Sequence, residues 1–263
     1  MKHTITTPWQ MIKFDGAVFS EQEDEIVTET PLTIRINGEE LATVVCTPNA
    51  LEDLTVGFLA AEGLIHSIAD IDQLSVNEER GFADVELKVK KSISHDYYAK
   101  RFISSCCGKS RQFYYHNDMR TAKTIMSQTK IAPAQCIFLM KELFQSSTEF
   151  QKTGGVHNAA LCHTTGILVS RADIGRHNTL DKIYGHCLRE KLNMSDKIIA
   201  FSGRMSSEIV LKSAKMGVGI LLSNSAPSDL ALQLAHDLQI TAIGFIREGQ
   251  MNIYTHPQRV IQI

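Results

Sequence analysis

The sequence predicts an α/β protein with a smaller α+β unit at its N-terminus, on two observations. From residue 153 onward, short apolar runs alternate with glycine-bearing loops and helix-like stretches, the pattern of strands joined by helical crossovers. Before residue 95, alternating apolar residues flank an Asn-Gly pair, which is typical of a strand hairpin. We therefore expect a small α+β unit over 1–95, a cysteine-containing loop and linker over 96–130, and an α/β domain over 131–263.

In the first unit, residues 1–30 are polar and are acidic between Glu21 and Glu25, so we expect a loosely attached lead-in. Leu51, Leu54 and Phe58 recur at helical spacing and predict an amphipathic helix. The elements expected after the lead-in are a strand at 32–36, a turn at Asn37 and Gly38, a strand at 41–46, the helix from about 49 to 64, and two strands around 76 and 85–89.

In the α/β domain, Gly217 follows a periodic helix and marks its end. The elements expected, in order, are a helix at about 134–144, a strand at 167–169, a helix ending near 192, a strand at 197–201, a helix at 208–216, a strand at 218–222, a helix at 229–238, a strand at 240–246 and a short strand at 252–254. Strands that alternate with helices in this way predict right-handed crossovers and a largely parallel sheet covered by helices.

The composition narrows the class of protein. The chain has 263 residues, 43% of them hydrophobic, and a formal net charge of −2. A nucleic-acid-binding protein would carry a basic excess, and a membrane span would need about 20 consecutive apolar residues, so neither is expected. The polar start lacks an apolar signal core, and six cysteines in so long a chain do not resemble a disulfide framework. We expect a cytoplasmic protein with reduced thiols.

Cys106 and Cys107 are adjacent in the polar stretch 104–111, together with Gly108, Lys109 and Arg111. Neighbouring positive charge lowers the pKa of a thiol and makes it nucleophilic, so the pair is a candidate for reactive chemistry. A chance pair of structural cysteines would fit the same stretch. The other cysteines fall in predicted strands or helices, where they are expected to be buried; they are Cys46, Cys136, Cys162 and Cys187.

Three loops that leave the carboxyl ends of predicted strands are rich in groups suited to an anion, and such loops share one edge of a sheet. Free N–H groups at helix starts and arginine side chains both favour phosphate, although Ser, Asn and Gly are also ordinary cap and turn residues. Three such loops, two of them with arginine, predict that the domain over 131–263 binds a nucleotide or a phosphate-bearing cofactor. The residues concerned are Arg176 and His177, then Ser202, Gly203, Arg204 and Ser206, then the loop 223–228.

A further predicted loop, rich in glycine and polar residues, contains Gly154, Gly155 and His157. Two glycines permit close backbone approach to a ligand, whereas His157 fits a ligand contact or an ordinary structural histidine equally well. Neither a phosphate-loop motif nor a dinucleotide-binding glycine motif is present, which argues against the usual NTPase and NAD classes. Adjacent cysteines do not match zinc-ligand spacing, and the zinc deaminase signature is missing, so no metal site is expected.

In combination, residues 104–108, 153–160, 173–178 and 202–208 closely resemble the FdhD family, the formate dehydrogenase accessory proteins that act as sulfur carriers. The resemblance covers nearly all of the chain beyond about residue 30. It implies a three-layer main domain similar to cytidine deaminase without the zinc site, and a cytoplasmic homodimer. It also implies that a cysteine desulfurase loads sulfur onto a loop cysteine as a persulfide. That sulfur then passes to the molybdenum bis(molybdopterin guanine dinucleotide) cofactor, before the cofactor enters formate dehydrogenase.

The family resemblance also implies site residues. Many members carry Cys-x-x-Cys, so alignment from the preceding serines makes Cys106 the carrier, and alignment from Gly108 makes it Cys107. The open, cationic surroundings of Cys107 favour Cys107. The segment comprising Phe245, Ile246, Arg247, Glu248, Gly249 and Gln250 is implied to belong to the guanine nucleotide site, for which GDP would be a surrogate ligand. Phe245 would stack on guanine or lie in the core.

Two other functions fit parts of the sequence. A non-catalytic, nucleotide-binding redox sensor would use Cys106 and Cys107 as its sensing pair and would accept no sulfur. A nucleobase deaminase would hold zinc. Whether the chain counts as an enzyme, a sulfurtransferase-like carrier with a persulfide intermediate, stays open at this point.

Overall fold

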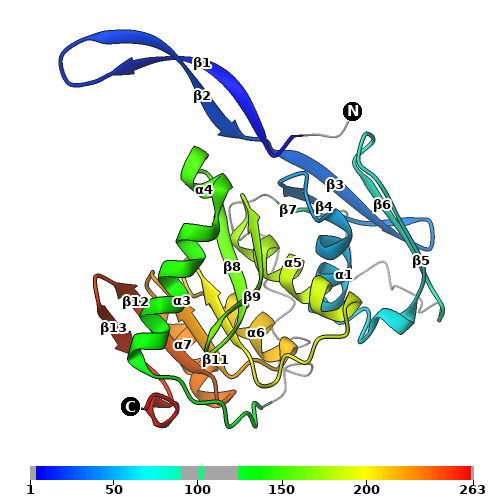
Figure 1. Cartoon of the computed structure of the whole chain (residues 1–263). Coiled ribbons are helices and arrows are strands. Elements are labelled where there is room, and N and C mark those ends of the chain that lie inside the picture. The colour runs from blue at the N-terminus through cyan, green and yellow to red at the C-terminus, as the bar shows by residue number, and fades with distance from the viewer. Residues whose placement is uncertain (1–3, 90–100, 104–123, 262–263) are drawn as a thin grey trace.

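The computed structural model describes residues 4–89, 101–103 and 124–261 (Figure 1). Cys106 and Cys107, with most of the predicted loop and linker, lie outside the described residues. The described chain forms three sheets: a two-stranded ribbon, a five-stranded sheet and a six-stranded sheet. The predicted mixed α/β class is therefore confirmed, whereas the likeness to cytidine deaminase and the domain boundaries stay predictions.

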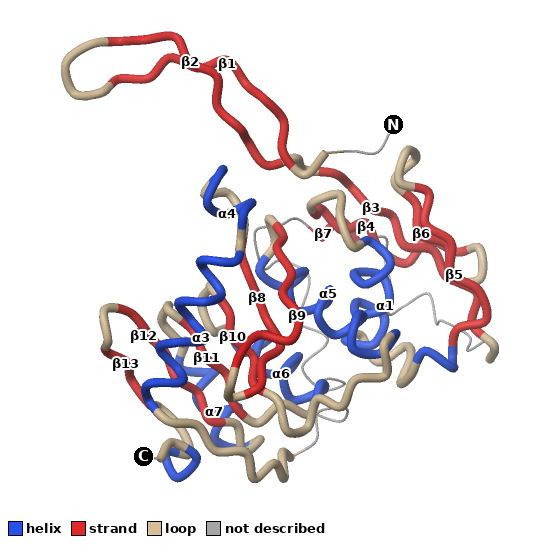
Figure 2. The backbone as a smooth tube through the Cα atoms, viewed as in Figure 1, coloured by secondary structure: helices blue, strands red, loops and turns tan. Residues whose placement is uncertain are grey.

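The first 30 residues are not a loose lead-in. β1 (Thr6–Phe14) and β2 (Phe19–Val27) pair as an antiparallel ribbon, which projects away from the body of the molecule (Figure 2). The carboxylate of Asp15 accepts hydrogen bonds from the amides of Ala17 and Val18 and shapes the turn at the tip. The acidic composition obscured the alternation of apolar and polar residues that a ribbon needs. We call residues 6–27 the arm.

Four strands of the five-stranded sheet follow the prediction, and the fifth, at 101–103, falls within the predicted loop and linker. Its strand order is β5-β6-β3-β4-β7, and the first hairpin turns at Asn37 and Gly38, whose φ angles are +51° and +84°. These positive angles are those that an Asn-Gly hairpin turn requires. The strands are β3 (Thr30–Ile36), β4 (Glu39–Cys46), β5 (Ile71–Asn77), β6 (Phe82–Leu87) and β7 (Arg101–Ile103), with α1 (Leu51–Ala61) and a short 3-10 turn, η1 (Ile68–Asp70), between β4 and β5.

The six-stranded sheet is mixed rather than largely parallel. Its order is β13-β12-β11-β10-β8-β9, and only the β10–β11 and β11–β12 pairs are parallel. β8 and β9 form a tight hairpin, and so do β12 and β13, and a hairpin forces antiparallel pairing. The strands are β8 (His157–His163), β9 (Gly166–Asp173), β10 (Ile198–Phe201), β11 (Ile220–Ser223), β12 (Thr241–Arg247) and β13 (Gln250–Ile253). The predicted loop that contains Gly154, Gly155 and His157 overlaps the start of β8, so the prediction of a loop was wrong for His157.

Helices cover both faces of this sheet (Figure 1). Alternate strand residues point to opposite faces. Ala160, Ala200 and Leu222 join one apolar cluster with α3, while Leu161, Ile199 and Leu221 join the second with α1, α5, α6 and α7. The helices are α3 (Pro133–Ser146), α4 (Thr148–Thr153), α5 (Arg176–Arg189), α6 (Ser207–Met216) and α7 (Asp229–Asp237), followed by a short 3-10 turn, η2 (Pro257–Arg259).

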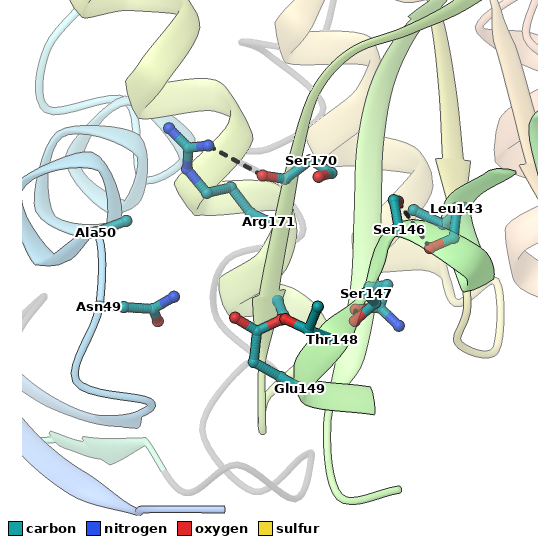
Figure 3. Close-up of a pocket in the computed structure, with 11 residues that line it drawn as sticks. Asn49, Ala50, Leu143, Ser146, Ser147, Thr148, Glu149, Ser170 and Arg171 are labelled. Carbon is teal, nitrogen blue, oxygen red and sulfur yellow. Dashed lines mark hydrogen bonds between the residues drawn. The ribbon is translucent and has the colours of Figure 1, made fainter. Parts of the chain in front are cut away.

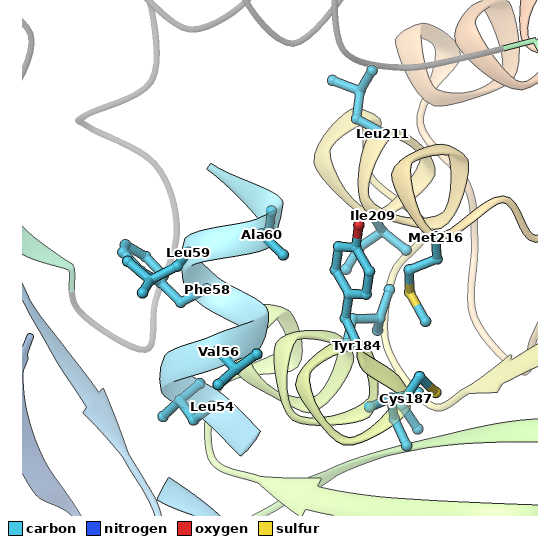
Figure 4. Packing of buried hydrophobic residues seen from close by; sticks show 14 of the residues in the cluster. Leu54, Val56, Phe58, Leu59, Ala60, Tyr184, Cys187, Ile209, Leu211 and Met216 are labelled. Carbon is cyan, nitrogen blue, oxygen red and sulfur yellow. The ribbon is translucent and has the colours of Figure 1, made fainter. Parts of the chain in front are cut away.

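α1 and α5 join the two larger sheets. A Cβ atom on Gly57 would lie 1.7 Å from the carbonyl oxygen of Asp181, and one on Gly185 would lie 1.8 Å from that of Asp53, so the two helices cross with their backbones in contact. Phe58 and Leu59 project from α1 on the side away from Tyr184 (Figure 4). α1 is therefore buried on nearly every side, and the prediction of an amphipathic helix was wrong because a second layer covers its other face.

Candidate functional site

The candidate site is the edge of the six-stranded sheet at which β10, β11 and β12 end and β8 begins. The amide of Ser202 donates to the carbonyl oxygen of Asn158 at 2.9 Å, and the amide of Asn158 donates to the Ser202 hydroxyl at 2.8 Å. The Ser223 hydroxyl donates to the carbonyl oxygen of Gly203 at 2.8 Å. These bonds join the loops that follow β10 and β11 to the first residues of β8.

The same edge continues to β12. The amide of Met205 donates to the carbonyl oxygen of Ala226 at 3.1 Å, and the amide of Phe245 donates to that of Ser225 at 3.3 Å. The predicted loops after β10 and β11 are thus bonded to each other, and the loop after β11 is bonded to β12. The structure brings them together as one continuous edge.

Positive charge lies at the centre of this edge. A Cβ atom on Gly203 would lie 3.3 Å from the Cβ of Arg176, so the loop before α5 meets the loop after β10. His177 Nε2 lies 2.8 Å from Glu208 Oε2, which links the first turns of α5 and α6. Burial lowers the pKa of His157 below its ordinary value, and the nearby positive charge of Arg176 lowers it further. His157 is accordingly neutral at pH 7.

Several buried polar atoms at or beside this edge have no hydrogen-bond partner among the described residues. They are Asn158 Nδ2, Ser206 Oγ and Asn224 Oδ1. Buried polar groups in folded proteins are nearly always paired, so unpaired ones here favour a polar ligand or bound water. Asn158 is 2% exposed, and its side chain was not among the predicted site residues.

The turn between β12 and β13 holds the predicted guanine nucleotide segment. Phe245 has a φ of +52°, in the left-handed region that a large side chain seldom adopts, and the strand register shifts between Gly244 and Arg247. The Arg247 guanidinium lies 5.4 Å from the centre of the Phe245 ring, with the ring half-exposed and Arg247 exposed. The structure thus presents an aromatic face and a cation beside the edge. Gly249, at φ +78°, makes the turn, Ile246 points into the core, and Glu248 and Gln250 are exposed.

Of the two glycines before β8, Gly155 lies against the arm. Gly154 ends α4 with a φ of +61°, and a Cβ on Gly155 would come within 3.0 Å of the Val27 side chain. Lys152 on α4 lies 3.5 Å from Glu25 of β2. The arm therefore begins directly beside the loop that leads into His157. Arg204, by contrast, is exposed.

A polar cavity of about 300 Å³ lies between the residues before α1, the strand β9 and the junction of α3 and α4 (Figure 3). Of the predicted site residues that the structure describes, none lines it. Asn158 does, together with Ser147, Asn49, Glu149 and Arg171. The Ser147 hydroxyl caps α4 and donates to Asn158 Oδ1 at 2.6 Å. The cap at Ser147 could be found in the sequence, but its contact with Asn158 depends on the fold.

A buried ion pair holds the loop before α5 in place. Lys182 Nζ and the Asp173 carboxylate are completely buried and lie 2.6 Å apart. Asp173 also accepts hydrogen bonds from the amides of Thr47 and Gly175 and from the Asn178 side chain. This network ties the end of β4 to the loop that carries Arg176 and His177. Lys182 could not be identified from the sequence, because one lysine in a helix is usually solvated.

The remaining four cysteines are free and buried, as predicted. Burial raises the pKa of each of these thiols to about 12, so they are poor nucleophiles; they are Cys46, Cys136, Cys162 and Cys187. Within the described ranges, no group of three His, Cys, Asp or Glu side chains is placed to hold a metal ion. In the same part of the chain, no helix is long and apolar enough to cross a membrane.

Known proteins similar to this chain include two curated relatives. The chain is 56% identical over 249 residues to the protein named "Sulfur carrier protein FdhD" of Geobacillus kaustophilus, covering 95% of each chain. It is 50% identical over 260 residues to the protein of the same name in Bacillus subtilis, covering 99% of each. A protein from Desulfotalea psychrophila, whose crystal structure is described as that of a formate dehydrogenase accessory protein, matches with a TM-score of 0.80.

That structure covers 98% of this chain and 100% of its own, and at 22% identity it shows that the fold is shared. The model of the FdhD/NarQ family matches residues 27–261, which is nearly the whole body of the molecule. The match begins at the last residue of the arm. This chain therefore belongs to the FdhD/NarQ family.

Proposed function

We propose that this chain is a sulfur carrier that supports the activity of a formate dehydrogenase. The observation that carries the proposal is its 56% identity, over 95% of both chains, to a protein named "Sulfur carrier protein FdhD". The sequence adds two adjacent thiols beside Lys109 and Arg111, while the four other thiols are buried. The carrier thiol is accordingly Cys107 or Cys106, with Cys107 favoured.

The loading step is an exchange reaction at sulfur. The carrier thiolate attacks the terminal sulfur of a persulfide on a cysteine desulfurase, the sulfur–sulfur bond breaks, and the donor cysteine leaves as a thiolate. The carrier then holds one extra sulfur atom as its own persulfide. Releasing that atom as sulfide requires two electrons, which a thiol reductant can supply.

The acceptor is proposed to be the molybdenum bis(molybdopterin guanine dinucleotide) cofactor, held as cargo at the loop edge. The pyrophosphates of this cofactor would suit Arg176, Arg204 and the serine loops, and its guanine would suit the half-exposed ring of Phe245. The unpaired Ser206 Oγ supports a polar ligand in this region. The full set proposed for the cofactor is Gly154, Gly155, His157, Arg176, His177, Ser202, Gly203, Arg204, Ser206, Phe245, Ile246, Arg247, Glu248, Gly249 and Gln250.

The proposed setting is a cytoplasmic homodimer with two successive protein partners. A cysteine desulfurase supplies the sulfur, and a formate dehydrogenase receives the sulfurated cofactor. The names of the curated relatives support the carrier role, and the shared family supports a common setting.

Mass spectrometry tests the loading step. Incubation with a cysteine desulfurase and cysteine should add about 32 Da, one sulfur atom, to the intact chain. The Cys107→Ala variant should lose the adduct, and Cys136→Ala, which removes a buried thiol, should retain it. If wild-type protein gains no sulfur but loses two hydrogens on mild oxidation, the redox-sensor function is favoured instead.

Calorimetric titration with GDP tests the cofactor site separately. We expect Arg176→Gln to weaken GDP binding at least ten-fold, because a phosphate contact is lost at the centre of the edge. Arg80→Gln, at the distant β5–β6 turn, is the matched control and should bind as wild type does. If both variants bind GDP with equal affinity, the loop edge is excluded as the nucleotide site.

A further inference from the structure

None of the residues proposed for the cofactor lines the polar cavity of about 300 Å³ (Figure 3). Its walls come from three separate segments, which are the residues before α1, the strand β9 and the junction of α3 with α4. Ser146, Thr148 and Ser170 line the cavity and are exposed, so it opens to solvent. Pockets that bind small molecules measure about 300–1,000 Å³, so this cavity has the size for a small ligand.

Glu149 brings a negative charge to the cavity. It is half-buried in the first turn of α4, and within the described chain its carboxylate is bonded only by the hydroxyl of the preceding residue, at 3.2 Å. Two cations lie in or beside the walls, and each has a carboxylate of its own. Arg171 lies 2.7 Å from Asp53, and Lys182 lies 2.6 Å from Asp173. The charge of Glu149 therefore lacks a counter-charge, which favours a ligand with a positive group.

Two side-chain amides that line the cavity have N–H groups to donate. Asn49 Oδ1 accepts from Lys182 Nζ at 2.7 Å and from the Thr47 hydroxyl at 2.8 Å, which fixes the oxygen of this amide and leaves its NH₂ group for another acceptor. Asn158 Oδ1 accepts from the Ser147 hydroxyl at 2.6 Å, and its Nδ2 is buried without a partner among the described residues. Because a buried donor without an acceptor is costly, these amides favour a ligand that carries oxygen atoms.

The acid and the amide donors come from different walls. In Figure 3 the Asn49 side chain extends from the segment before α1, and the Glu149 carboxylate extends from α4. Leu143 and Ala50 add apolar contacts to the same lining. One small molecule in the cavity can therefore meet a carboxylate at one end and amide N–H groups at the other.

We propose that this cavity binds a free α-amino acid with a small side chain. The ammonium group of the amino acid pairs with the Glu149 carboxylate, and its carboxylate accepts hydrogen bonds from the amides of Asn49 and Asn158. A zwitterion satisfies both ends at once, whereas Glu149 would repel a simple anion and a simple amine would leave the amides unpaired. This site goes beyond the proposed carrier function and requires neither Cys106 nor Cys107.

Thermal unfolding with added amino acids tests for binding. The probes are L-alanine, L-serine, L-threonine, L-valine and L-cysteine at about 20 mM, added to a chain that carries Cys106→Ala and Cys107→Ala so that the adjacent thiols cannot react. A ligand that binds only the folded chain raises its unfolding temperature, and we expect at least one probe to raise it by about 2 °C or more. If none of the five probes shifts the transition, the proposal is wrong.

Calorimetric titration with the probe that binds best locates the site. Glu149→Gln should raise the dissociation constant at least ten-fold, because the ammonium group loses its counter-charge, and Asn158→Asp should do the same, because an acceptor replaces the donor. Glu86→Gln, at an exposed position of β6, is the matched control and should bind as wild type does. Equal affinity of Glu149→Gln and Glu86→Gln would overturn the inference. If Asn158→Asp does not fold, Glu149→Gln alone decides, since within the described chain Glu149 forms no ion pair that the fold would lose.

Analogues of the ligand test its two charged ends separately. For L-alanine these are propionate, which lacks the ammonium group, and ethylamine, which lacks the carboxylate; corresponding analogues serve for the other probes. Each analogue should bind to the wild-type chain at least ten-fold more weakly than the amino acid. Glu149→Gln should weaken the binding of L-alanine but not that of propionate, because the variant also removes a repulsive charge. If propionate binds the wild-type chain as tightly as L-alanine does, the cavity takes a simple anion and the proposed ligand class is wrong.

Sulfur loading separates this site from the carrier function. With both adjacent cysteines present, Glu149→Gln should gain about 32 Da from a cysteine desulfurase and cysteine, as the wild-type chain should. A wild-type chain that gains this sulfur yet binds none of the five amino acids would overturn the cavity site and leave the carrier function standing. A chain that binds an amino acid through Glu149 yet gains no sulfur would support the cavity site and overturn the carrier function.

Discussion

The His157 ring is half-buried at the candidate edge, and its pKa is lowered from the ordinary 6.5, first by burial and then by the positive charge of Arg176. Between the lowered value and pH 6.5 the unfolded chain binds a proton at this residue and the folded chain does not. The contribution of His157 to the free energy of unfolding is therefore fully present above pH 6.5 and is lost as the pH falls toward the lowered value.

The variant His157→Gln should reduce the pH dependence of stability. We expect the difference in free energy of unfolding between pH 7.5 and pH 5.5 to shrink, with a limiting slope change of about 1.4 kcal/mol per pH unit for one proton. Urea unfolding at the two pH values measures it. His236→Gln, on the exposed side of α7, is the control, and an unchanged difference in His157→Gln would contradict the prediction.

The six cysteines should fall into two groups by the reactivity of their thiols. The chain has six, and burial raises the pKa of four of them to about 12, so at pH 8 almost none of those four is thiolate. Iodoacetamide should modify at most two thiols in the native protein and all six in denaturant. Native modification of more than two, counted by intact mass, would show that a buried site opens.

At the scale of elements, the crossing of α1 and α5 depends on two glycines. Gly57→Ala should lower the free energy of unfolding by about 3 kcal/mol or more, because the new methyl group would meet the backbone of Asp181 and push the helices apart. Gly166→Ala is the matched control, since its nearest neighbour would be the Glu142 carboxylate at 3.8 Å. Denaturant unfolding of both variants measures the effect, and similar stabilities would contradict the predicted clash.

The buried pair between Lys182 and Asp173 links β4, β9 and α5. Lys182→Met should cost about 3–5 kcal/mol of stability, because it leaves the Asp173 carboxylate buried without a counter-charge. Lys197→Met removes a lysine paired with the half-exposed Asp196 and should cost less than about 1 kcal/mol. Equal costs in thermal or urea unfolding would contradict the predicted penalty for burying the carboxylate without its lysine.

Elements fixed by local chemistry were predictable from the sequence. The Asn37–Gly38 hairpin follows from turn geometry, and the end of α6 follows from Gly217, which has a φ of +81°. Elements that depend on distant contacts were not. β8 followed a glycine pair and was taken for a loop, and α1 seemed amphipathic because the covering helix lies more than a hundred residues later in the chain.

The candidate site could likewise be predicted from the sequence only in part. Strand–loop–helix order placed the Arg176 and Ser202 loops at one edge, since loops at strand ends share an edge. The bonds between Asn158 and Ser202, and the contact of Gly155 with Val27, require the fold itself. The roles proposed for these residues stay predictions until the binding experiments are done.

At the scale of the whole molecule, one apolar cluster joins both larger sheets. It runs from Leu32 and Ile34 in β3, through α1 and α5, to Ile199 in β10. A chain of 263 residues often unfolds through intermediates. An intermediate forms only where one apolar core stays folded after another has unfolded. Here α1 belongs to the packing of both sheets, and the hydrogen bonds of Asp173 and Lys182 to Thr47, directly after β4, cross the same boundary.

We therefore expect the body to unfold as one cooperative unit. Calorimetry should show a single transition whose van't Hoff enthalpy equals the calorimetric enthalpy, and Gly57→Ala should move that transition to lower temperature without splitting it. Tryptophan fluorescence is a poor probe of this event, because Trp9 lies on the arm and outside both clusters. Two resolved transitions, or a ratio of van't Hoff to calorimetric enthalpy well below one, would show that the five-stranded and six-stranded sheets unfold independently. In that case α1 would be a contact between two domains.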